Sequence, residues 1–481
     1  MVQLISSLLP HQEYGLNWCL KREENGCILA DDMGLGKTVT SCALMVSNHV
    51  KTIIIVPVAL LEQWDAEISK HTDGLSTFIY HGDNRNKMAQ ESQESQESQE
   101  SLDFQDYDIV ITTIHTIISD FKKGIIEIYK NFDRIIIDEA HKLKNYKSVS
   151  HMIISTVFRR TQYKLLLTGT PICNNIGDLI SLIILLNMSP YNNLDYWRYM
   201  PIEEKICLIE ENKNEFVLHR TKADILKSTL PDIKINTVKL SLTNNLQSKT
   251  YNNLKKKQHS FKLLKILRMR QCLNEIKLIN DNDCTDTNEI SNEIRDVLCE
   301  KIIKVQSIIQ QVPNNEKIVI FSQWKTMLDI LSEFIDIPYV IYHGGMNMKE
   351  KNETLEKFKT CPDTRILLIT LKCGGCGLNL NVANHAIIVE PYYNHSEERQ
   401  AIDRIYRIGQ TKKVFINKLC ISNSVENWMR QLQSSKLCLS GMILQNKGTS
   451  DDIEKNLMRT KKMFEFFVDE CGDENDEDLD I

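Results

Sequence analysis

A short loop that contains two glycines carries the first residues able to do chemistry. In "ILADDMGLGKT", Gly34 and Gly36 precede Lys37 and Thr38, after a strand-like run and before a helical one. Glycines let the backbone curl so that its N–H groups point at phosphate oxygens, and the start of a helix adds partial positive charge. Lys37 would reach the β- and γ-phosphates, and the Thr38 hydroxyl would hold Mg²⁺. Asp31 stands where such a loop usually has its first glycine, so a glycine-rich turn beside a helix is the alternative.

An acidic pair further along the chain favours the nucleotide site. The segment "RIIIDEAHKLKN" puts Asp138 and Glu139 at the end of a buried strand, where ligands bind in open α/β sheets. Asp138 can hold Mg²⁺, and Glu139 can orient and deprotonate an attacking water. The loop and the pair together predict a nucleoside triphosphate hydrolase.

Two arginines late in the chain suggest how such a site is completed. Arg404 and Arg407 lie three apart in "RQAIDRIYRIGQ", on a predicted helix and hence on one face of it. As arginine fingers from a second lobe they would stabilise charge on the transferring phosphoryl group. A surface helix with ion pairs is the alternative.

The elements that position these residues alternate between strands and helices. Runs rich in Ile, Leu and Val without polar alternation are typical of buried parallel strands. They lie at 27–30, 52–57, 107–113, 132–140 and 163–171, and a second series lies at 317–323, 339–345, 364–370, 385–390 and 414–419. A strand-like segment at 233–240 precedes the second series. With helical stretches between them, the runs predict two doubly wound α/β lobes.

The domain boundaries follow from changes in this pattern. We expect an ATP-binding lobe over 1–234, a second lobe over 235–440 with a helical insertion at about 243–312, and a C-terminal extension with an acidic tail over 441–481. The triplet repeat "QESQESQESQES" predicts a disordered insert at about 88–102. The acidic tail could contact a basic partner or simply solubilise the chain.

Composition excludes some classes of protein. The chain has 481 residues, a formal net charge of -6 and 42% hydrophobic residues, so nucleic-acid binding would need a local basic surface. No signal peptide or membrane-spanning run is visible, which predicts a soluble intracellular protein without a membrane partner. Cys373 and Cys376 have metal-like or redox-like spacing, but no second pair completes a zinc site, which favours packing.

The motifs resemble a known family when taken in order. They are "LLPHQEYGLNW", "DDMGLGKT", "IIIVPVALLEQW", "VITTIHT", "IIIDEAHKLKN", "LLLTGTP", "FVLHRTKADI", "IVIFSQW", "LKCGGCGLNL" and "RIYRIGQ". The set resembles the Swi/Snf-type (sucrose-nonfermenting type two) ATPases of helicase superfamily two, from about Leu8 to Lys436. The loop of that family resembles Asp-x-Met-Gly-Leu-Gly-Lys-Thr, so Asp31 is the family form.

The resemblance implies two RecA-like lobes with helical insertions, and an ATPase that is stimulated by double-stranded DNA and uses ATP and Mg²⁺. Roles are implied for individual positions. Gln12 would read adenine, the loop residues Asp32, Met33, Gly34, Leu35, Gly36, Lys37 and Thr38 would bind triphosphate and metal, and Asp138 and Glu139 would hold metal and water. His141, Thr168 and Thr170 would couple ATP to the DNA, Arg404, Arg407 and Gln410 would close the site, and Thr113, Gln323, Trp324 and Lys372 would contact DNA.

The function expected from the resemblance is a duplex DNA translocase that remodels or displaces a DNA-bound protein, such as a nucleosome or a polymerase. The alternatives are a strand-separating DNA or RNA helicase, a viral ATPase of the transcription-termination type, and a non-hydrolysing DNA-binding scaffold. A nuclear location is expected, or a cytoplasmic virus factory if the source is a large DNA virus, which the many Ile, Asn and Lys residues suggest.

Overall fold

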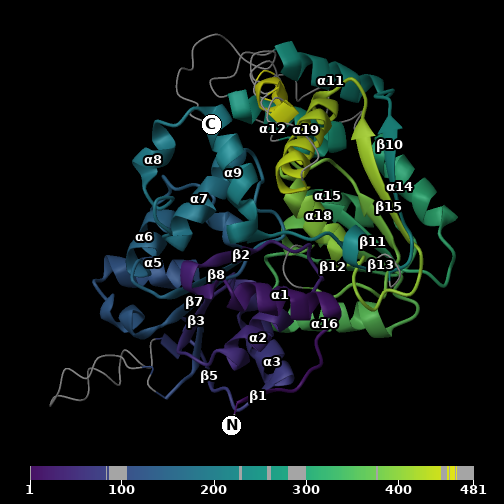
Figure 1. Cartoon of the computed structure of the whole chain (residues 1–481). Coiled ribbons are helices and arrows are strands. Elements are labelled where there is room, and N and C mark those ends of the chain that lie inside the picture. The colour runs from purple at the N-terminus through teal and green to yellow at the C-terminus, as the bar shows by residue number, and fades with distance from the viewer. Residues whose placement is uncertain are drawn as a thin grey trace. The chain divides into compact units, whose positions relative to one another are not determined.

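Two structural units make up the chain (Figure 1). The first contains 1–227 and 439–455, and the second contains 228–438 and 456–481. The computed structural model describes residues 2–82, 84–85, 104, 106–226, 230–256, 262–279, 299–374, 378–445, 452–453, 455–460 and 462. The insert predicted at 88–102 and the acidic tail at 469–481 lie outside the described residues.

A seven-stranded parallel sheet forms the centre of the first unit. In spatial order its strands are β5 (Thr77–Ile79), β6 (Ile109–Thr112), β3 (Thr52–Ile55), β7 (Arg134–Ile137), β8 (Tyr163–Leu167), β2 (Cys27–Leu29) and β9 (Val217–Leu218). The five strands predicted for this lobe are confirmed. The short strands β5 and β9 were not predicted, because two or three residues are too few to show a periodic pattern.

Helices cover both faces of this sheet (Figure 1). They are α1 (Pro10–Leu20), α2 (Lys37–Ser47), α3 (Leu61–His71), α5 (Ile114–Lys122), α6 (Val149–Val157), α7 (Ile176–Leu186), α8 (Leu194–Arg198), α9 (Ile202–Phe216) and α10 (Lys222–Ile225). Alternate strand residues such as Ile54 and Ile136 pack against α1, α2 and α3. Their neighbours Ile53 and Ile135 are equally buried on the other face. Burial on both faces explains why the strands are apolar throughout.

A six-stranded parallel sheet forms the centre of the second unit. In spatial order its strands are β10 (Ile233–Leu240), β15 (Val414–Ile421), β14 (His385–Ile388), β11 (Ile318–Ser322), β13 (Ile366–Thr370) and β12 (Tyr339–Tyr342). All six were predicted. The prediction of two doubly wound parallel-sheet lobes is therefore confirmed.

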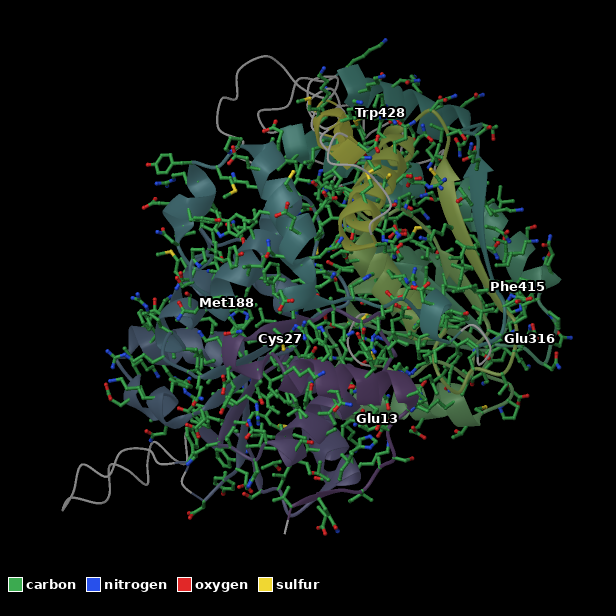
Figure 2. The ribbon with its side chains drawn as sticks, in the orientation of Figure 1. Glu13, Cys27, Met188, Glu316, Phe415 and Trp428 are labelled. Carbon is green, nitrogen blue, oxygen red and sulfur yellow. The ribbon has the colours of Figure 1, made fainter. Side chains whose placement is uncertain are left out.

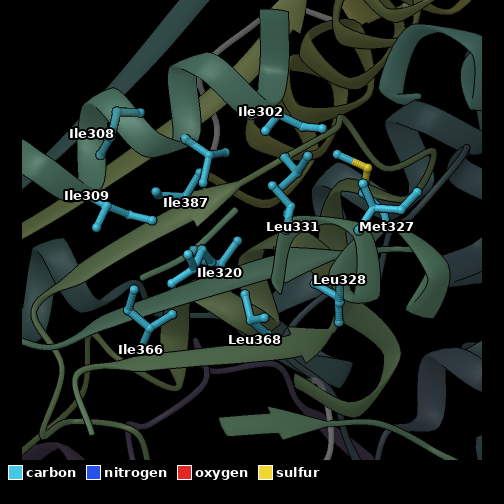
Figure 3. Packing of buried hydrophobic residues seen from close by; sticks show 14 of the residues in the cluster. Ile302, Ile308, Ile309, Ile320, Met327, Leu328, Leu331, Ile366, Leu368 and Ile387 are labelled. Atoms are coloured by element: carbon cyan, nitrogen blue, oxygen red, sulfur yellow. The ribbon is translucent and has the colours of Figure 1, made fainter. Parts of the chain in front are cut away.

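The helices of the second unit again lie on both faces of its sheet. They are α11 (Asn245–Lys256), α12 (Lys262–Asn274), α14 (Glu300–Gln311), α15 (Lys325–Ser332), α16 (Met348–Thr360), α17 (Leu371–Gly374), α18 (His395–Asp403) and α19 (Val425–Gln445), the last of which begins in this unit. Figure 3 shows Ile302, Ile309 and Leu331 from α14 and α15 packed against strand residues Ile320 and Ile387. A separate cluster with residues of α16 and α18 fills the other face.

Helices α11 and α12 form a helical layer before the second sheet continues. Their apolar residues share a core with the start of α19, where the Val425 N–H donates to the Tyr251 hydroxyl at 2.9 Å. Trp428 packs against the same core (Figure 2). The insertion is thus held by the unit that contains it.

The described residues contain neither a membrane-spanning helix nor a cluster of metal-ligating side chains. No helix in those ranges combines the length and apolarity needed to cross a bilayer. No group of three or more His, Cys, Asp or Glu side chains there is arranged to hold a metal ion. Cys373 is a free thiol in α17, and Cys376 lies outside the described residues.

Candidate active site

The glycine loop turns sharply between β2 and α2. Gly34 and Gly36 have φ of 84° and 88°, a left-handed conformation that favours glycine. A Cβ atom on Gly36 would lie 2.2 Å from the Gln12 Nε2 atom, so the Gln12 amide would have to move to admit a side chain. Lys37 opens α2, and its ammonium donates to the Asp31 carbonyl at 2.6 Å. Thr38 follows on the first turn of the same helix.

Asp31, the residue in place of the usual glycine, anchors the loop. Its carboxylate accepts two hydrogen bonds from Arg220, at 2.9 and 2.5 Å, and both side chains are nearly buried. Arg220 also donates to the His11 carbonyl at 2.6 Å. This bidentate pair ties the loop to α1 and to the segment after β9. Asp31, which replaces the usual glycine, therefore has a structural role: it links the loop to Arg220.

The other loop residues are held from two sides. The Asp32 carboxylate accepts the Lys222 N–H at 2.9 Å. Met33 lies against Gly169, where a Cβ atom would come within 3.1 Å of the Met33 Cγ atom. Leu35 is buried, and its carbonyl accepts a hydrogen bond from Gln12 at 3.3 Å. Gln12 is thus adjacent to the glycine loop, as a residue of a nucleotide site must be.

The acidic pair lies directly after β7. Trp64 Nε1 donates to Asp138 Oδ2 at 2.9 Å, and the Glu139 N–H donates to Asp138 Oδ1 at 2.8 Å. Burial, with the nearby charge of Glu139, raises the pKa of Asp138 to about 6, although the indole N–H and the Lys37 ammonium both favour the ionised form. The glycine loop follows β2 and the acidic pair follows β7, two strands separated only by β8, and the Lys37 ammonium is near enough to favour the ionised form of Asp138.

A chain of polar contacts runs from Glu139 to the end of β8. Glu139 is one of the few non-glycine residues with positive φ, at 52°, which is a strained conformation common at functional sites. The His141 Nδ1 atom lies 3.3 Å from a Glu139 carboxylate oxygen and 3.3 Å from the Thr168 hydroxyl. That hydroxyl accepts the Thr170 N–H at 3.1 Å. The three predicted coupling residues are therefore brought together beside the acidic pair.

The sheet order explains why these groups meet. The loop, the acidic pair, Thr168 and Arg220 follow β2, β7, β8 and β9 respectively, which are neighbours in the order β7-β8-β2-β9. All four strands are parallel, so their carboxyl ends lie at one edge of the sheet. The backbone cradle at this edge fits a triphosphate, and the hydroxyl and carboxylate oxygens beside it fit Mg²⁺.

In the second unit, Gln323 and Trp324 follow β11 and are held in place by Arg270 of α12. The guanidinium donates to the Gln323 Oε1 atom at 2.7 Å and lies 5.2 Å from the centre of the Trp324 ring. The buried Glu390 carboxylate accepts hydrogen bonds from the Ser322 hydroxyl and the Gln323 N–H. Burial raises the pKa of Glu390 to about 7 despite these bonds and the nearby lysine and arginine charges. Gln323 and Trp324 therefore rest on a buried polar support.

The other two residues with predicted DNA contacts differ in their surroundings. Lys372 is exposed in α17, at the carboxyl end of β13. Thr113 is 1% exposed, and its hydroxyl caps α5 by accepting the Thr116 N–H at 3.2 Å. The geometry gives the predicted DNA contact of Thr113 no support.

The prediction that Arg404 and Arg407 share one helical face is wrong. Helix α18 ends at Asp403, Arg404 is its C-cap, and Arg407 lies in the turn beyond. At the end of the helix the Arg404 N–H donates to the Ala401 carbonyl, a tighter turn than the helical pattern, and the Arg404 carbonyl accepts the Leu380 N–H at 3.0 Å. Gln410 is buried and donates to the carbonyls of 381, 383 and 405, so its amide fixes this turn.

The sequence predicted no role for three residues that shape these sites: Trp64, Arg220 and Arg270. Trp64 and Arg220 lie inside the motifs "ALLEQW" and "LHRTKADI". That position was the only signal available, since neither residue type indicates a contact far along the chain. Arg270 lies in a basic run that equally suits a solvated helix face.

Two protein-family models together match residues 11–409 of this chain. The SNF2-related domain matches residues 11–318, and the helicase conserved C-terminal domain matches residues 300–409. The probable global transactivator of Orgyia pseudotsugata multicapsid polyhedrosis virus is 27% identical, over 93% of this chain and 94% of its own length. The ISWI chromatin-remodeling complex ATPase ISW2 of Saccharomyces cerevisiae is 29% identical over 91% of this chain, which spans only 41% of that relative. A solved structure, the Sulfolobus solfataricus SWI2/SNF2 ATPase core in complex with dsDNA, covers 96% of this chain at 24% identity with a TM-score of 0.40.

Proposed function

Because the chain belongs to the SNF2-related family of helicase superfamily two ATPases, we propose that it is a double-stranded DNA translocase that remodels or displaces DNA-bound protein. The observation that carries the proposal is the convergence of Lys37 with Asp138 and Glu139 at the carboxyl edge of the first sheet. A site with this arrangement supports nucleotide hydrolysis, and the family relation supports coupling of hydrolysis to DNA.

In this proposal the first unit binds and activates the substrate ATP. The loop N–H groups and Lys37 bind the β- and γ-phosphates, and Gln12 contacts the adenine. Thr38 and Asp138 hold Mg²⁺, which supplies charge neutralisation of the phosphates when bound. Glu139 orients the attacking water and takes its proton. The strained backbone of Glu139 and its contact with His141 support this role, because they fix the carboxylate.

The second unit completes the reaction in this proposal. Arg404 and Arg407 stabilise negative charge on the phosphoryl group, an effect of about 10³–10⁵-fold in other phosphoryl-transfer enzymes. Gln410 acts through them, since its buried amide fixes the turn that carries both arginines. Closure of the two units on ATP and their release after hydrolysis would then move the protein along DNA.

The same proposal assigns coupling and DNA contacts. His141, Thr168 and Thr170 transmit the state of the nucleotide site, because they join the acidic pair to the end of β8. Gln323, Trp324 and Lys372 contact the DNA, mainly at phosphates. The displaced protein is a nucleosome or a polymerase, in the nucleus or in a cytoplasmic virus factory. The relative from a polyhedrosis virus, which matches along nearly its whole length, supports a viral source.

Steady-state ATP hydrolysis tests the proposal. The purified chain is assayed alone and with duplex DNA, single-stranded DNA or RNA, beside Lys37→Ala and the control Lys349→Ala, an exposed lysine on α16. We expect strong stimulation by duplex DNA that is lost in the first variant and kept in the second. Stimulation by single strands or RNA alone would indicate a strand-separating helicase, and no hydrolysis in any condition would indicate a scaffold.

A further inference from the structure

The outer strand of the second sheet has one free edge among the described residues. Strand β10 pairs with β15 along all eight of its residues and with no other described strand (Figure 1). In this parallel ladder Val414 donates to the Asp232 carbonyl and Ser422 to the Leu240 carbonyl, so even-numbered backbone groups point toward β15. The N–H and C=O groups of the odd-numbered residues, including Ile235 and Thr237, therefore point outward.

A hollow of about 260 Å³ adjoins this edge, and we call it the edge hollow. Ile235 and Thr237 of β10 contribute to its floor, and residues of α18 and α19 form its walls. Ile235 is 50% exposed, and Leu437 of α19, which also lines the hollow, is 46% exposed. A sheet face of this kind is ordinarily covered, and the space is several times the ~30 Å³ of a water molecule. It is large enough to accept an aliphatic side chain.

The net charge of the residues that line the edge hollow is positive, because its one carboxylate, Glu398, is neutralised by Lys418. Glu398 accepts from Lys418 at 2.7 Å, from Gln433 at 2.8 Å and from the Tyr392 N–H at 2.7 Å. Burial opposes ionisation of Glu398, but Lys418 and these bonds outweigh it and hold its pKa below the usual range. This carboxylate is therefore fully engaged.

Apart from the Glu398–Lys418 pair, the titratable residues that line the hollow are His395 and Arg430. Burial lowers the pKa of His395 to about 4, so this ring is neutral at pH 7. Arg430 reaches across the hollow and donates to the Thr237 hydroxyl at 2.8 Å. Lys234 and Lys239 are exposed along β10 itself. Lysines on an edge strand discourage pairing with most strands, but they attract an acidic one.

We propose that the outer edge of β10 and the edge hollow form a docking site for an extended acidic segment of a partner protein. The segment adds to β10 as a further strand and places an aliphatic side chain between Ile235 and Leu437. In such strand addition the main-chain hydrogen bonds give affinity, and the pocket for alternate side chains gives specificity. Acidic side chains of the segment meet Arg430 and the two edge lysines. None of these residues belongs to the ATP site or the proposed DNA contacts, so this site could be present or absent whatever the catalytic function is.

Fluorescence anisotropy with synthetic peptides tests this site. The probe is a labelled acetyl-Glu-Asp-Leu-Asp-Ile-Glu-Asp-amide, compared with a peptide in which every acid is replaced by lysine. We expect the acidic probe to bind the full chain with a Kd in the micromolar range and the basic one not to bind. Equal binding of both peptides, or no binding of the acidic one at millimolar protein, would overturn the proposal.

Variants locate the binding. Thr237→Pro removes an outward N–H and the hydroxyl that accepts from Arg430, while the ladder to β15 is retained. Arg430→Glu reverses the charge beside the hollow. Each should weaken binding about tenfold or more, whereas the control Lys349→Glu on α16 should not change it. If Thr237→Pro fails to fold, Arg430→Glu tests the docking site by itself, and unaltered binding of the acidic probe to this variant would overturn the proposal. Serine in place of the acidic residues of 469–481 distinguishes the occupant, because tighter probe binding by that variant would assign the edge to this chain's own acidic run.

Discussion

Restoring the glycine that the loop lacks should damage the protein. Asp31→Gly creates the common phosphate-loop pattern, so a reading of the motif alone expects unchanged or better nucleotide binding. The structure predicts the opposite, because Asp31 forms a bidentate ion pair with Arg220. The side chains are only 2% and 12% exposed. The variant would leave a nearly buried guanidinium with one partner fewer.

The size of the effect follows from the geometry. Breaking a buried pair by removing one member costs about 3–5 kcal/mol. Arg220 keeps its bond to the His11 carbonyl, which places the expected loss near the lower end, at about 3 kcal/mol. With a urea m-value of about 2 kcal/mol/M, the unfolding midpoint should fall by about 1.5 M. Asp31→Asn, which keeps the shape but not the charge, should lose roughly half as much.

Urea unfolding followed by tryptophan fluorescence measures this loss, and a fluorescent ATP analogue measures nucleotide affinity. The double variant Asp31→Gly/Arg220→Met removes both charges and should recover much of the stability, which gives a large coupling energy in the double-mutant cycle. The reasoning is refuted if Asp31→Gly unfolds at the wild-type urea concentration and binds the analogue at least as tightly. Additive effects of the two single variants would also contradict it.

Three further predictions follow from other contacts. Gly36→Ala should weaken binding of the ATP analogue more than about tenfold, because its new Cβ atom meets the amide of the α1 glutamine. The control Gly124→Ala has a similar φ of 77° and open space around it, so it should bind the analogue normally. Equal affinity of the two variants would count against the cradle. Arg270→Lys loses the flat cation on Trp324 and its bond to the neighbouring amide, so duplex-stimulated ATP hydrolysis should fall about tenfold while the unstimulated rate stays the same; equal loss of both rates would mean general damage. The stability of Glu390→Gln relative to the wild type should increase as pH rises. In the wild type the folded carboxyl keeps its proton to about pH 7, whereas the unfolded one loses it near pH 4.5. The wild type thus loses up to about 3 kcal/mol of stability between these values, and a difference in urea midpoint that is the same at pH 5 and pH 8 would refute this.

The sequence predicts most strands of the two sheets well because these strands are buried on both faces. Runs such as "TIIIVP" and "KIVIFSQ" are apolar throughout, which few other structures require, and they became β3 and β11. The same property locates the nucleotide site, since the glycine loop and the acidic pair follow such strands directly. Local pattern and local structure coincide in these segments.

Prediction from the sequence ends where a contact joins distant segments. Nothing local indicates that Trp64 donates to Asp138 or that Arg220 pairs with Asp31, because each contact depends on the order of the strands. The helix expected to carry Arg404 and Arg407 failed for the same reason. The residue at its end, Arg404, accepts a hydrogen bond from Leu380, which no helical pattern near 404 could indicate.

Displacement of a third strand from duplex DNA is the most direct measurement of the central claim. A triplex on a long duplex is incubated with ATP and either the wild type or Glu139→Gln, beside a forked duplex that reports strand separation. The account predicts that the wild type releases the third strand only with ATP, that Glu139→Gln does not, and that the forked duplex stays intact. Unwinding of the fork, or ATP hydrolysis without release of the third strand, would contradict duplex translocation.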